Sequence, residues 1–177
     1  TLAEEILTPG KGQVRALIVN GGNPALVFSD TGTTLEALKS LDLLVVNDLF
    51  LSATARHADY VVAVAHPFER VDIPMLSDAY FPFAFNQYTD KVVTKQDDVI
   101  EEWEFFWRVA QAMGTGFTLP GIAAGEMPDA DAVIAGLNPD ARISLAEMKA
   151  ASPSGVVYGD GRTEVGGVIP DMLGHAD

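Results

Sequence analysis

The amino-acid sequence predicts an α/β fold with a mostly parallel sheet. Three short apolar runs are each followed by polar or turn-forming residues, and helical segments separate them. The runs do not alternate between apolar and polar residues, which is typical of parallel strands that are buried on both faces. The resulting order of strand, helix, strand, helix, strand predicts a Rossmann-like, three-layer domain.

The expected strands are Arg15–Asn20, Leu43–Asn47 and Tyr60–Ala65, and a short helical turn at Ala3–Leu7 precedes them. The first strand has a continuous apolar body, so we expect it to be fully buried. Each strand stops at residues that favour a turn or a polar site, and we expect their carboxyl ends to lie at one edge of the sheet.

Helices are expected between these strands. A loop is predicted to run through Phe28, and the capping-box pattern of Thr33 and Glu36 predicts that the next helix opens there. Ser52 is expected to cap a short helix that continues through Ala58. The helix that opens at Thr33 places three apolar residues on one face: Leu35, Leu38 and Leu41.

The clearest helix in the second half is Asp98–Met113, where apolar residues recur every three or four positions and Gly114 follows as a C-terminal cap. Before it, Asp72–Val93 is rich in aromatic residues and has no clear period. We therefore expect a long loop there, with one strand at Lys91–Thr94.

Two further short helices are predicted, Asp129–Ala135 and Ser144–Ala150, and the second matches a capping box with Glu147. Beyond Ser152 the chain is rich in glycine, so we expect an irregular or frayed tail. We predict a Rossmann-like domain over residues 1–116 and a helical and irregular extension over 117–177.

Composition excludes several classes of function. Eleven basic residues against 25 acidic ones give a formal charge of −14, and the scattered cations argue against nucleic-acid binding. The absence of cysteine excludes disulfides and thiol chemistry from these residues, and three widely spaced histidines form no zinc pattern. No apolar run approaches the ~20 residues of a membrane span, so we expect none.

The strand ends carry the candidate site. Two glycines at Gly21–Gly22 allow the backbone to approach a phosphate closely, and Asn47 and Asp48 offer hydrogen-bonding groups for a nucleoside. An ordinary turn and a turn cap at Asp48 are open alternatives, because the G-x-G-x-x-G pattern of dinucleotide binders is absent. His66, which precedes Pro67, is interpreted as a loop residue in preference to a catalytic base.

Three segments together resemble the molybdopterin oxidoreductase family, which includes formate dehydrogenase, nitrate reductases and dimethyl sulfoxide reductase. The segments are ALIVNGGNP at Ala16–Pro24, LDLLVVNDLFLSATA at Leu41–Ala55 and ADYVV at Ala58–Val62. The resemblance extends over about 2–114, and 143–159 is similar to the stretch before the family's C-terminal domain. The chain departs from the family pattern at Ala63–Ala65 and after Glu69, an acid that matches the family.

The resemblance implies a domain that holds one guanosine dinucleotide arm of a bis(molybdopterin guanine dinucleotide) cofactor around Mo or W. The redox chemistry would belong to that cofactor, and we expect these residues alone to hold no cofactor and to catalyse nothing. The cofactor-binding residues that the resemblance implies are Asn20, Gly21, Gly22, Asn23, Pro24, Asn47, Asp48, Phe50, Ser52 and Thr54. Gly22 is expected to need either a positive φ or close backbone approach.

The family's iron–sulfur cysteine cluster, its metal-ligand domain and its C-terminal barrel are not in these 177 residues. The sequence therefore predicts an excised domain of a larger oxidoreductase whose partners are the remaining domains of the same chain. A free-standing nucleotide-binding or protein-interaction module is the alternative, and a small NAD-type dehydrogenase is a third interpretation. We also expect weak self-association through the Asp72–Phe85 tract.

Overall fold

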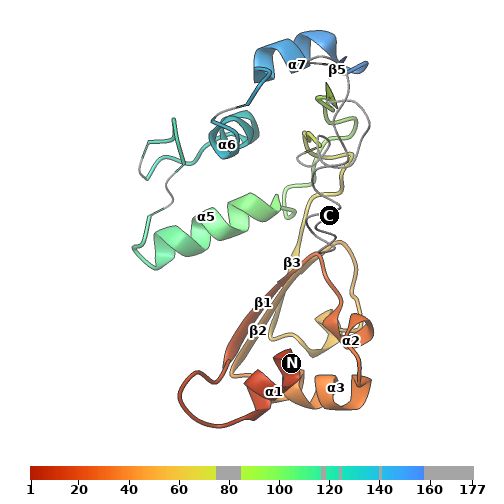
Figure 1. The fold of residues 1–177 in the computed structure, drawn as a ribbon, viewed down its shortest axis with the longest axis vertical. Coiled ribbons are helices and arrows are strands. Elements are labelled where there is room, and N and C mark those ends of the chain that lie inside the picture. Colours follow the sequence, from red (N-terminus) through yellow and green to blue (C-terminus); the bar gives the residue numbers. More distant parts are fainter. Residues whose placement is uncertain (75–84, 117–118, 124, 140, 158–177) are drawn as a thin grey trace, which may run out of the picture. The chain divides into compact units, whose positions relative to one another are not determined.

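The computed structural model describes residues 1–74, 85–116, 119–123, 125–139 and 141–157 (Figure 1). The chain divides into two compact units. The first comprises Thr1–His66 and Lys95–Arg108, and the second contains Pro67–Thr94 and the chain from Val109 onward. The domain boundary predicted after residue 116 stays a prediction.

A three-stranded parallel sheet forms the centre of the first unit. Its strands are β1 (Ala16–Asn20), β2 (Leu43–Asp48) and β3 (Tyr60–Ala63), in the order β1-β2-β3. The predicted α/β fold with a parallel sheet is confirmed. In the β1–β2 register Asn20 lies opposite Asn47, so the carboxyl ends of the two strands are neighbours.

Helices pack on one face of this sheet (Figure 1). These are α2 (Pro24–Val27), α3 (Thr31–Ser40) and the short 3-10 turn η1 (Ala55–His57), and α1 (Leu2–Leu7) packs against α3. Side chains alternate along a strand, so every second residue of β1 and β2 faces the helices. The buried core there consists of Val19, Ala25, Leu38, Leu44, Val46 and Ala55.

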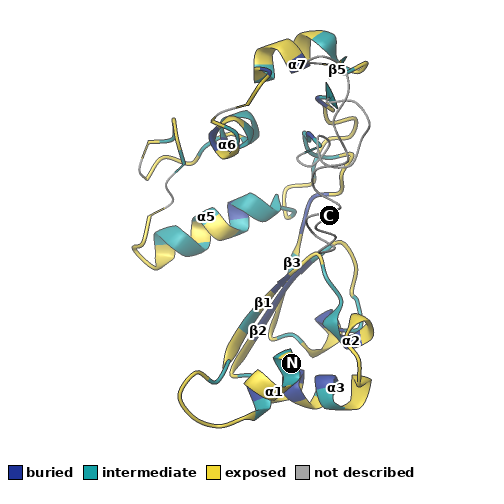
Figure 2. Cartoon of the chain, in the orientation of Figure 1, coloured by how far each residue is buried: buried dark blue, intermediate teal, exposed yellow. Residues whose placement is uncertain are grey.

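The opposite face of the sheet is covered less completely. Ile18 is 42% exposed and Tyr60 is 65% exposed, whereas most of β2 is buried (Figure 2). The expectation that Arg15–Asn20 is a fully buried strand is therefore wrong. β1 is an outer strand of the described sheet, and the core formed with the helices includes Val19 and Leu17, which lie on its other face.

Two helix starts differ from the prediction. Residues up to Phe28 are not a loop, because Asn23-Pro24 opens α2, with Pro24 in the first turn, where its missing N–H costs no hydrogen bond. The next helix begins before Thr33. Asp30 is its N-cap, and its carboxylate accepts hydrogen bonds from the Thr33 N–H at 3.1 Å and the Thr33 hydroxyl at 2.6 Å.

Two other elements are shorter than predicted. The helix expected through Ala58 is only the single turn η1, and the third strand ends two residues early. Val64 instead makes one parallel bridge to Ile100, which also explains why α5 (Glu102–Ala112) starts after the predicted Asp98. Gly114 follows α5 with a φ of +67°, as a C-terminal cap requires.

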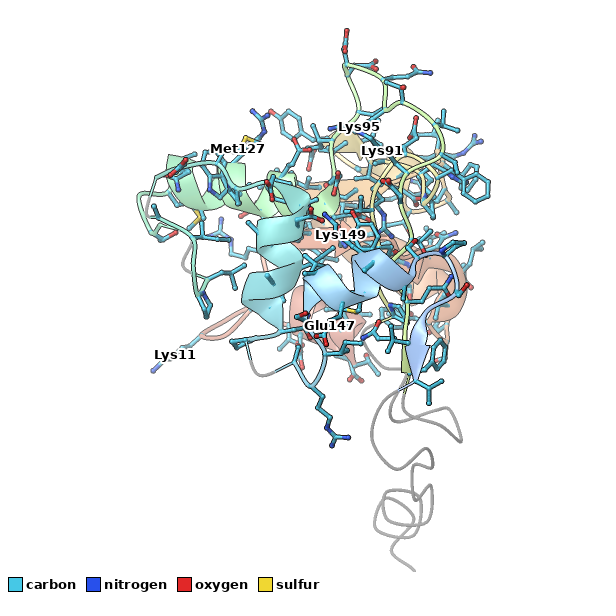
Figure 3. All side chains as sticks on the ribbon, turned by 90° about the horizontal axis from the view of Figure 1, so that it is seen from above. Lys11, Lys91, Lys95, Met127, Glu147 and Lys149 are labelled. Carbon is cyan, nitrogen blue, oxygen red and sulfur yellow. The ribbon has the colours of Figure 1, made fainter. Side chains whose placement is uncertain are left out.

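The second unit has its own small core of Ile73, Tyr88, Ile143 and Met148. Helix α6 (Ala130–Leu137) begins after its N-cap Asp129, where the predicted helix starts, and α7 (Leu145–Ala151) begins after the predicted cap Ser144. Lys149 of α7, labelled in Figure 3, lies 4.9 Å from the centre of the Tyr88 ring and pairs with Asp131.

The predicted strand at Lys91–Thr94 is wrong. The short strand of that region is β4 (Phe85–Asn86), which pairs antiparallel with β5 (Val156–Val157). The chain beyond Ser152 thus contributes one strand, β5, to this pair before it leaves the described region at residue 157. Residues 75–84 and 158–177, which include ten residues of the Asp72–Phe85 tract and most of the predicted tail, lie outside the described residues.

Candidate functional site

The turn after β1 forms one side of the candidate site. Asn20 ends the strand, and Gly21 follows with a φ of +63°, in the left-handed region that glycine adopts readily. The Gly21 N–H donates to the Asn47 carbonyl at 2.9 Å, which joins the turn to the end of β2. The two predicted binding segments are therefore at the same edge of the sheet.

Gly22 does not have the positive φ that the sequence allowed. A Cβ at Gly22 would make an ordinary contact, 3.6 Å from a side-chain atom of Val19, and a Cβ at Gly21 would meet open space. The special backbone conformation of the turn therefore belongs to Gly21. Close backbone approach of a ligand, the other expectation for Gly22, stays a prediction.

Asn47 is the most unusual polar residue at this edge. Its side chain is fully buried, and its Nδ2 donates to the Asn20 Oδ1 at 3.0 Å. Its Oδ1 is also buried and has no hydrogen-bond partner among the described residues. A buried acceptor without a donor costs free energy, so this oxygen is suited to a donor supplied by another molecule or segment.

The loop after β2 forms the other side. The Asp48 Oδ1 accepts from the Phe50 N–H at 3.1 Å, which leaves further acceptor capacity on the half-buried carboxylate. Phe50 is 73% exposed. Ser52 is half-buried, and its hydroxyl accepts a hydrogen bond from the Ala55 N–H at 3.3 Å, as an N-terminal cap would.

Asn23 and Thr54 join the two sides. The Asn23 Oδ1 accepts from the Thr54 hydroxyl at 2.8 Å and from the Thr54 N–H at 3.1 Å. The Thr54 Oγ1 in turn accepts from the Ala25 N–H at 3.1 Å. We call these three hydrogen bonds the Asn23–Thr54 clasp. All ten predicted site residues thus lie on two segments, 20–24 and 47–54, which the structure brings together.

Exposed apolar side chains flank the clasp on both segments, and sequence reasoning missed them. Leu26 and Val27 of α2 are 69% and 74% exposed, and Leu51 is 61% exposed beside Phe50. The signal that could have revealed the first pair is Asn23-Pro24, which also matches a helix start. A one-turn helix here directs two apolar residues outward instead of burying them in a loop.

Glu69, the acid that matched the family, belongs to the second unit. Among the residues that the structure describes, no group of three histidine, aspartate or glutamate side chains is arranged to hold a metal ion. A search of the same residues finds no helix with the length and hydropathy needed to cross a bilayer.

Comparison with known families identifies the class. The model of the molybdopterin oxidoreductase family matches residues 1–112, which is more than half of the chain and includes both segments of the candidate site. The chain therefore belongs to the molybdopterin oxidoreductase family, and the resemblance predicted from the strand-end motifs is confirmed.

Individual relatives agree with this assignment. The chain is 33% identical over 114 residues to the F420-dependent formate dehydrogenase 1 subunit alpha of Methanococcus maripaludis, covering 63% of this chain and 16% of that protein. It is 27% identical over 124 residues to the trimethylamine-N-oxide reductase of Haemophilus influenzae, covering 64% and 15%. The chain thus spans only about one sixth of the length of these relatives.

A solved structure shares the fold. Acetylene hydratase from Pelobacter acetylenicus superimposes with a TM-score of 0.57 and 25% identity, covering 64% of this chain and 15% of that one. The match supports the α/β architecture. It also agrees with the relatives in covering a small share of a much longer chain.

Proposed function

We propose that the chain is a domain of a molybdenum or tungsten oxidoreductase and that its β1–β2 edge binds one guanosine dinucleotide arm of a bis(molybdopterin guanine dinucleotide) cofactor. In this role residues 1–116 bind the nucleotide, and 117–177 lead toward a C-terminal domain. Redox chemistry comes from the metal of the cofactor, and this chain's residues position its nucleotide arm. The second dinucleotide arm and any iron–sulfur cluster would be held by other parts of the enzyme.

The observation that carries the proposal is that the Asn47 Oδ1, beside the Gly21 turn, has no hydrogen-bond partner in the part of the chain that the structure describes. A nucleoside presents hydroxyl and N–H donors next to acceptors, and such a ligand would satisfy this buried oxygen. The exposed Asn20 amide, whose Oδ1 is used by Asn47, retains its Nδ2 donors for an acceptor on the same ligand. These residues therefore fit a nucleotide group.

The neighbouring residues suit the remaining parts of such a ligand. The Asp48 carboxylate can accept hydrogen bonds from ribose hydroxyls, and the Gly21–Gly22 backbone can approach a phosphate without interference from a Cβ. Phe50 exposes an aromatic ring at the same edge, which offers a surface for stacking. Each contribution is a positioning interaction and none is a redox step.

The test uses the full-length enzyme that contains this domain. In an Asn47→Leu variant a buried amide is replaced by an apolar side chain of similar size, so the fold should be kept while the acceptor is lost. We expect the purified variant to contain less than half of the wild-type guanosine, measured as nucleotide released by acid hydrolysis per protein, and correspondingly less metal by mass spectrometry.

A Leu43→Asn variant provides the matched control. Leu43 lies on the same face of β2 as Asn47 but at the opposite end of the strand, so its substitution should leave guanosine content unchanged. If Asn47→Leu retains wild-type guanosine and metal, the β1–β2 edge is not the nucleotide site.

A further inference from the structure

We infer that Thr54 is a positioning residue: the Asn23–Thr54 clasp sets the shape of the β1–β2 edge, and neither clasp side chain needs to touch the ligand. This inference rests on the proposed function of that edge. It assigns to Asn23 and Thr54 a role that acts through the two loops, whereas Asn47 and Asp48 keep the direct contacts.

The burial and pairing of Thr54 support this division of roles. Its side chain is completely buried, and its hydroxyl donates to the Asn23 Oδ1 and accepts from the Ala25 N–H. The hydroxyl's one proton is therefore used inside the chain, so the hydroxyl has no donor left for a ligand. Asn47 is equally buried, but its Oδ1 has no donor among the described residues.

The position of the clasp explains what it stabilises. Its partners are 29 and 31 residues apart in sequence, so the clasp connects the two loops in addition to the hydrogen bond between the Gly21 N–H and the Asn47 carbonyl. The clasp also adjoins the hydrophobic core. Ala25, whose N–H donates to Thr54, and Ala55, which follows Thr54, both belong to that core and are 1% and 3% exposed. The clasp therefore ties the loops that carry Gly21–Gly22 and Asp48–Phe50 to the packed core.

Threonine is suited to this position because one hydroxyl can donate and accept at once. Valine has the same shape and could do neither. A Thr54→Val substitution would leave the buried Ala25 N–H without an acceptor and the Asn23 Oδ1 with one donor in place of two. The loops should then move more, while the strands beneath them keep their packing.

The experiment compares Thr54→Val, Thr54→Ser and Asn47→Leu in the full-length enzyme. The readouts are bound guanosine per protein and amide hydrogen exchange of the cofactor-free form. In Thr54→Val we expect guanosine content to fall below half and exchange to accelerate about tenfold in residues 21–28 and 48–54, with β2 unchanged. Thr54→Ser, which keeps the hydroxyl, should restore both.

Each alternative outcome overturns a defined statement. Wild-type guanosine and exchange in Thr54→Val, with guanosine lost in Asn47→Leu, would overturn the positioning role and leave the proposed function standing. Equal loss in Thr54→Ser would also overturn it, because bulk rather than the hydroxyl would then be responsible. Wild-type guanosine in Asn47→Leu as well would overturn the proposed function itself.

A second variant covers the case in which Thr54→Val disrupts the core. Asn23 is only half-buried, so Asn23→Ala opens the clasp from its outer side and leaves Thr54 in place. It must produce the same loss of guanosine and the same loop exchange, and Asn23→Asp, which keeps the oxygen acceptor, must not. Wild-type guanosine content and exchange in Asn23→Ala, or the same losses in Asn23→Asp, would overturn the inference.

Discussion

Gly21 and Gly22 are neighbours with different backbone requirements. Gly21 has a φ of +63°, where an L-residue is disfavoured, and Gly22 does not. The sequence could not distinguish them, because a Gly-Gly pair allows the left-handed conformation at either position. The distinction becomes visible only once the Gly21 N–H is paired with the Asn47 carbonyl.

Alanine substitutions should separate the two roles. We expect Gly21→Ala to lower the free energy of unfolding by about 1 to 2 kcal/mol because of its left-handed backbone. Gly22→Ala should leave stability nearly unchanged, since its Cβ makes only an ordinary contact, yet lower guanosine content if a phosphate approaches there. Urea denaturation and nucleotide analysis check the two expectations, and equal destabilisation by both variants would contradict the first.

The residue types of the candidate site could be predicted from the sequence, but their individual roles could not. Strand-end position was enough to select Asn47 and Asp48. The unpaired Oδ1 of Asn47 depends on which side chains surround it, and the clasp depends on a contact between residues 31 positions apart. No local pattern carries that information.

At the scale of elements, a capping pattern in the sequence predicted the start of a helix correctly where no second capping residue stood nearby. The capping box at Ser144 and Glu147 was predicted and is present in α7. In α3 the Thr33 pattern competed with Asp30, which precedes it and occupies a left-handed backbone conformation, with a φ of 58°. Aspartate tolerates that conformation better than most residues. The capping-box pattern specifies residue types only, so it does not take this backbone conformation into account.

The Asp30 cap predicts a pH dependence. Hydrogen bonds from the Thr33 hydroxyl, and then from the Thr33 N–H, lower the pKa of Asp30 below its ordinary value. A lowered folded-state pKa stabilises α3 above the ordinary pKa of aspartate, about 3.9, and this contribution is lost as pH falls through the folded-state value.

Two variants test this cap. Asp30→Asn keeps an oxygen acceptor and the left-handed tolerance, so it should unfold close to wild type at neutral pH and lose less stability than wild type between about pH 4 and pH 2. Asp30→Ala should be destabilised at neutral pH. Thermal unfolding at neutral and at acidic pH measures the stability of both variants. A wild-type melting temperature for Asp30→Ala at neutral pH would refute the assignment of Asp30 as the cap.

Strand burial was the element property that sequence predicted least well. A run such as Ala16–Val19 indicates a strand that is buried on both faces, but the prediction assumes that every covering layer is present. In the described residues the core formed with the helices lies on one face, and on the other face Ile18 is 42% exposed although Val45 and Asn47 of β2 are buried there. The apolar pattern is therefore consistent with a larger assembly around this sheet.

At the scale of the whole molecule, exposed apolar surface and chain length lead to the same interpretation. The first unit exposes Leu26, Val27, Phe50, Leu51 and Tyr60, and the chain spans about one sixth of its relatives. Large apolar side chains grouped on a surface usually contact another protein surface. In the parent enzyme we expect the remaining domains to cover them.

The isolated chain should consequently self-associate weakly, through this exposed surface as well as through the Asp72–Phe85 tract predicted from the sequence. We expect light scattering to show a mean mass that rises with protein concentration above the 18.9 kDa of the monomer. A double variant, Phe50→Ser with Tyr60→Ser, should reduce the rise, because both side chains are more than half exposed. A constant monomer mass for the wild-type chain at high concentration would contradict the expectation.

The most direct test of the nucleotide site is a structure of the full-length enzyme with its cofactor bound. We predict that a guanosine donor lies within about 3.2 Å of the Asn47 Oδ1, with the Asp48 carboxylate next to the same nucleoside. A guanosine bound elsewhere, with the Asn47 Oδ1 paired to another segment of the polypeptide, would contradict the proposed role of the β1–β2 edge.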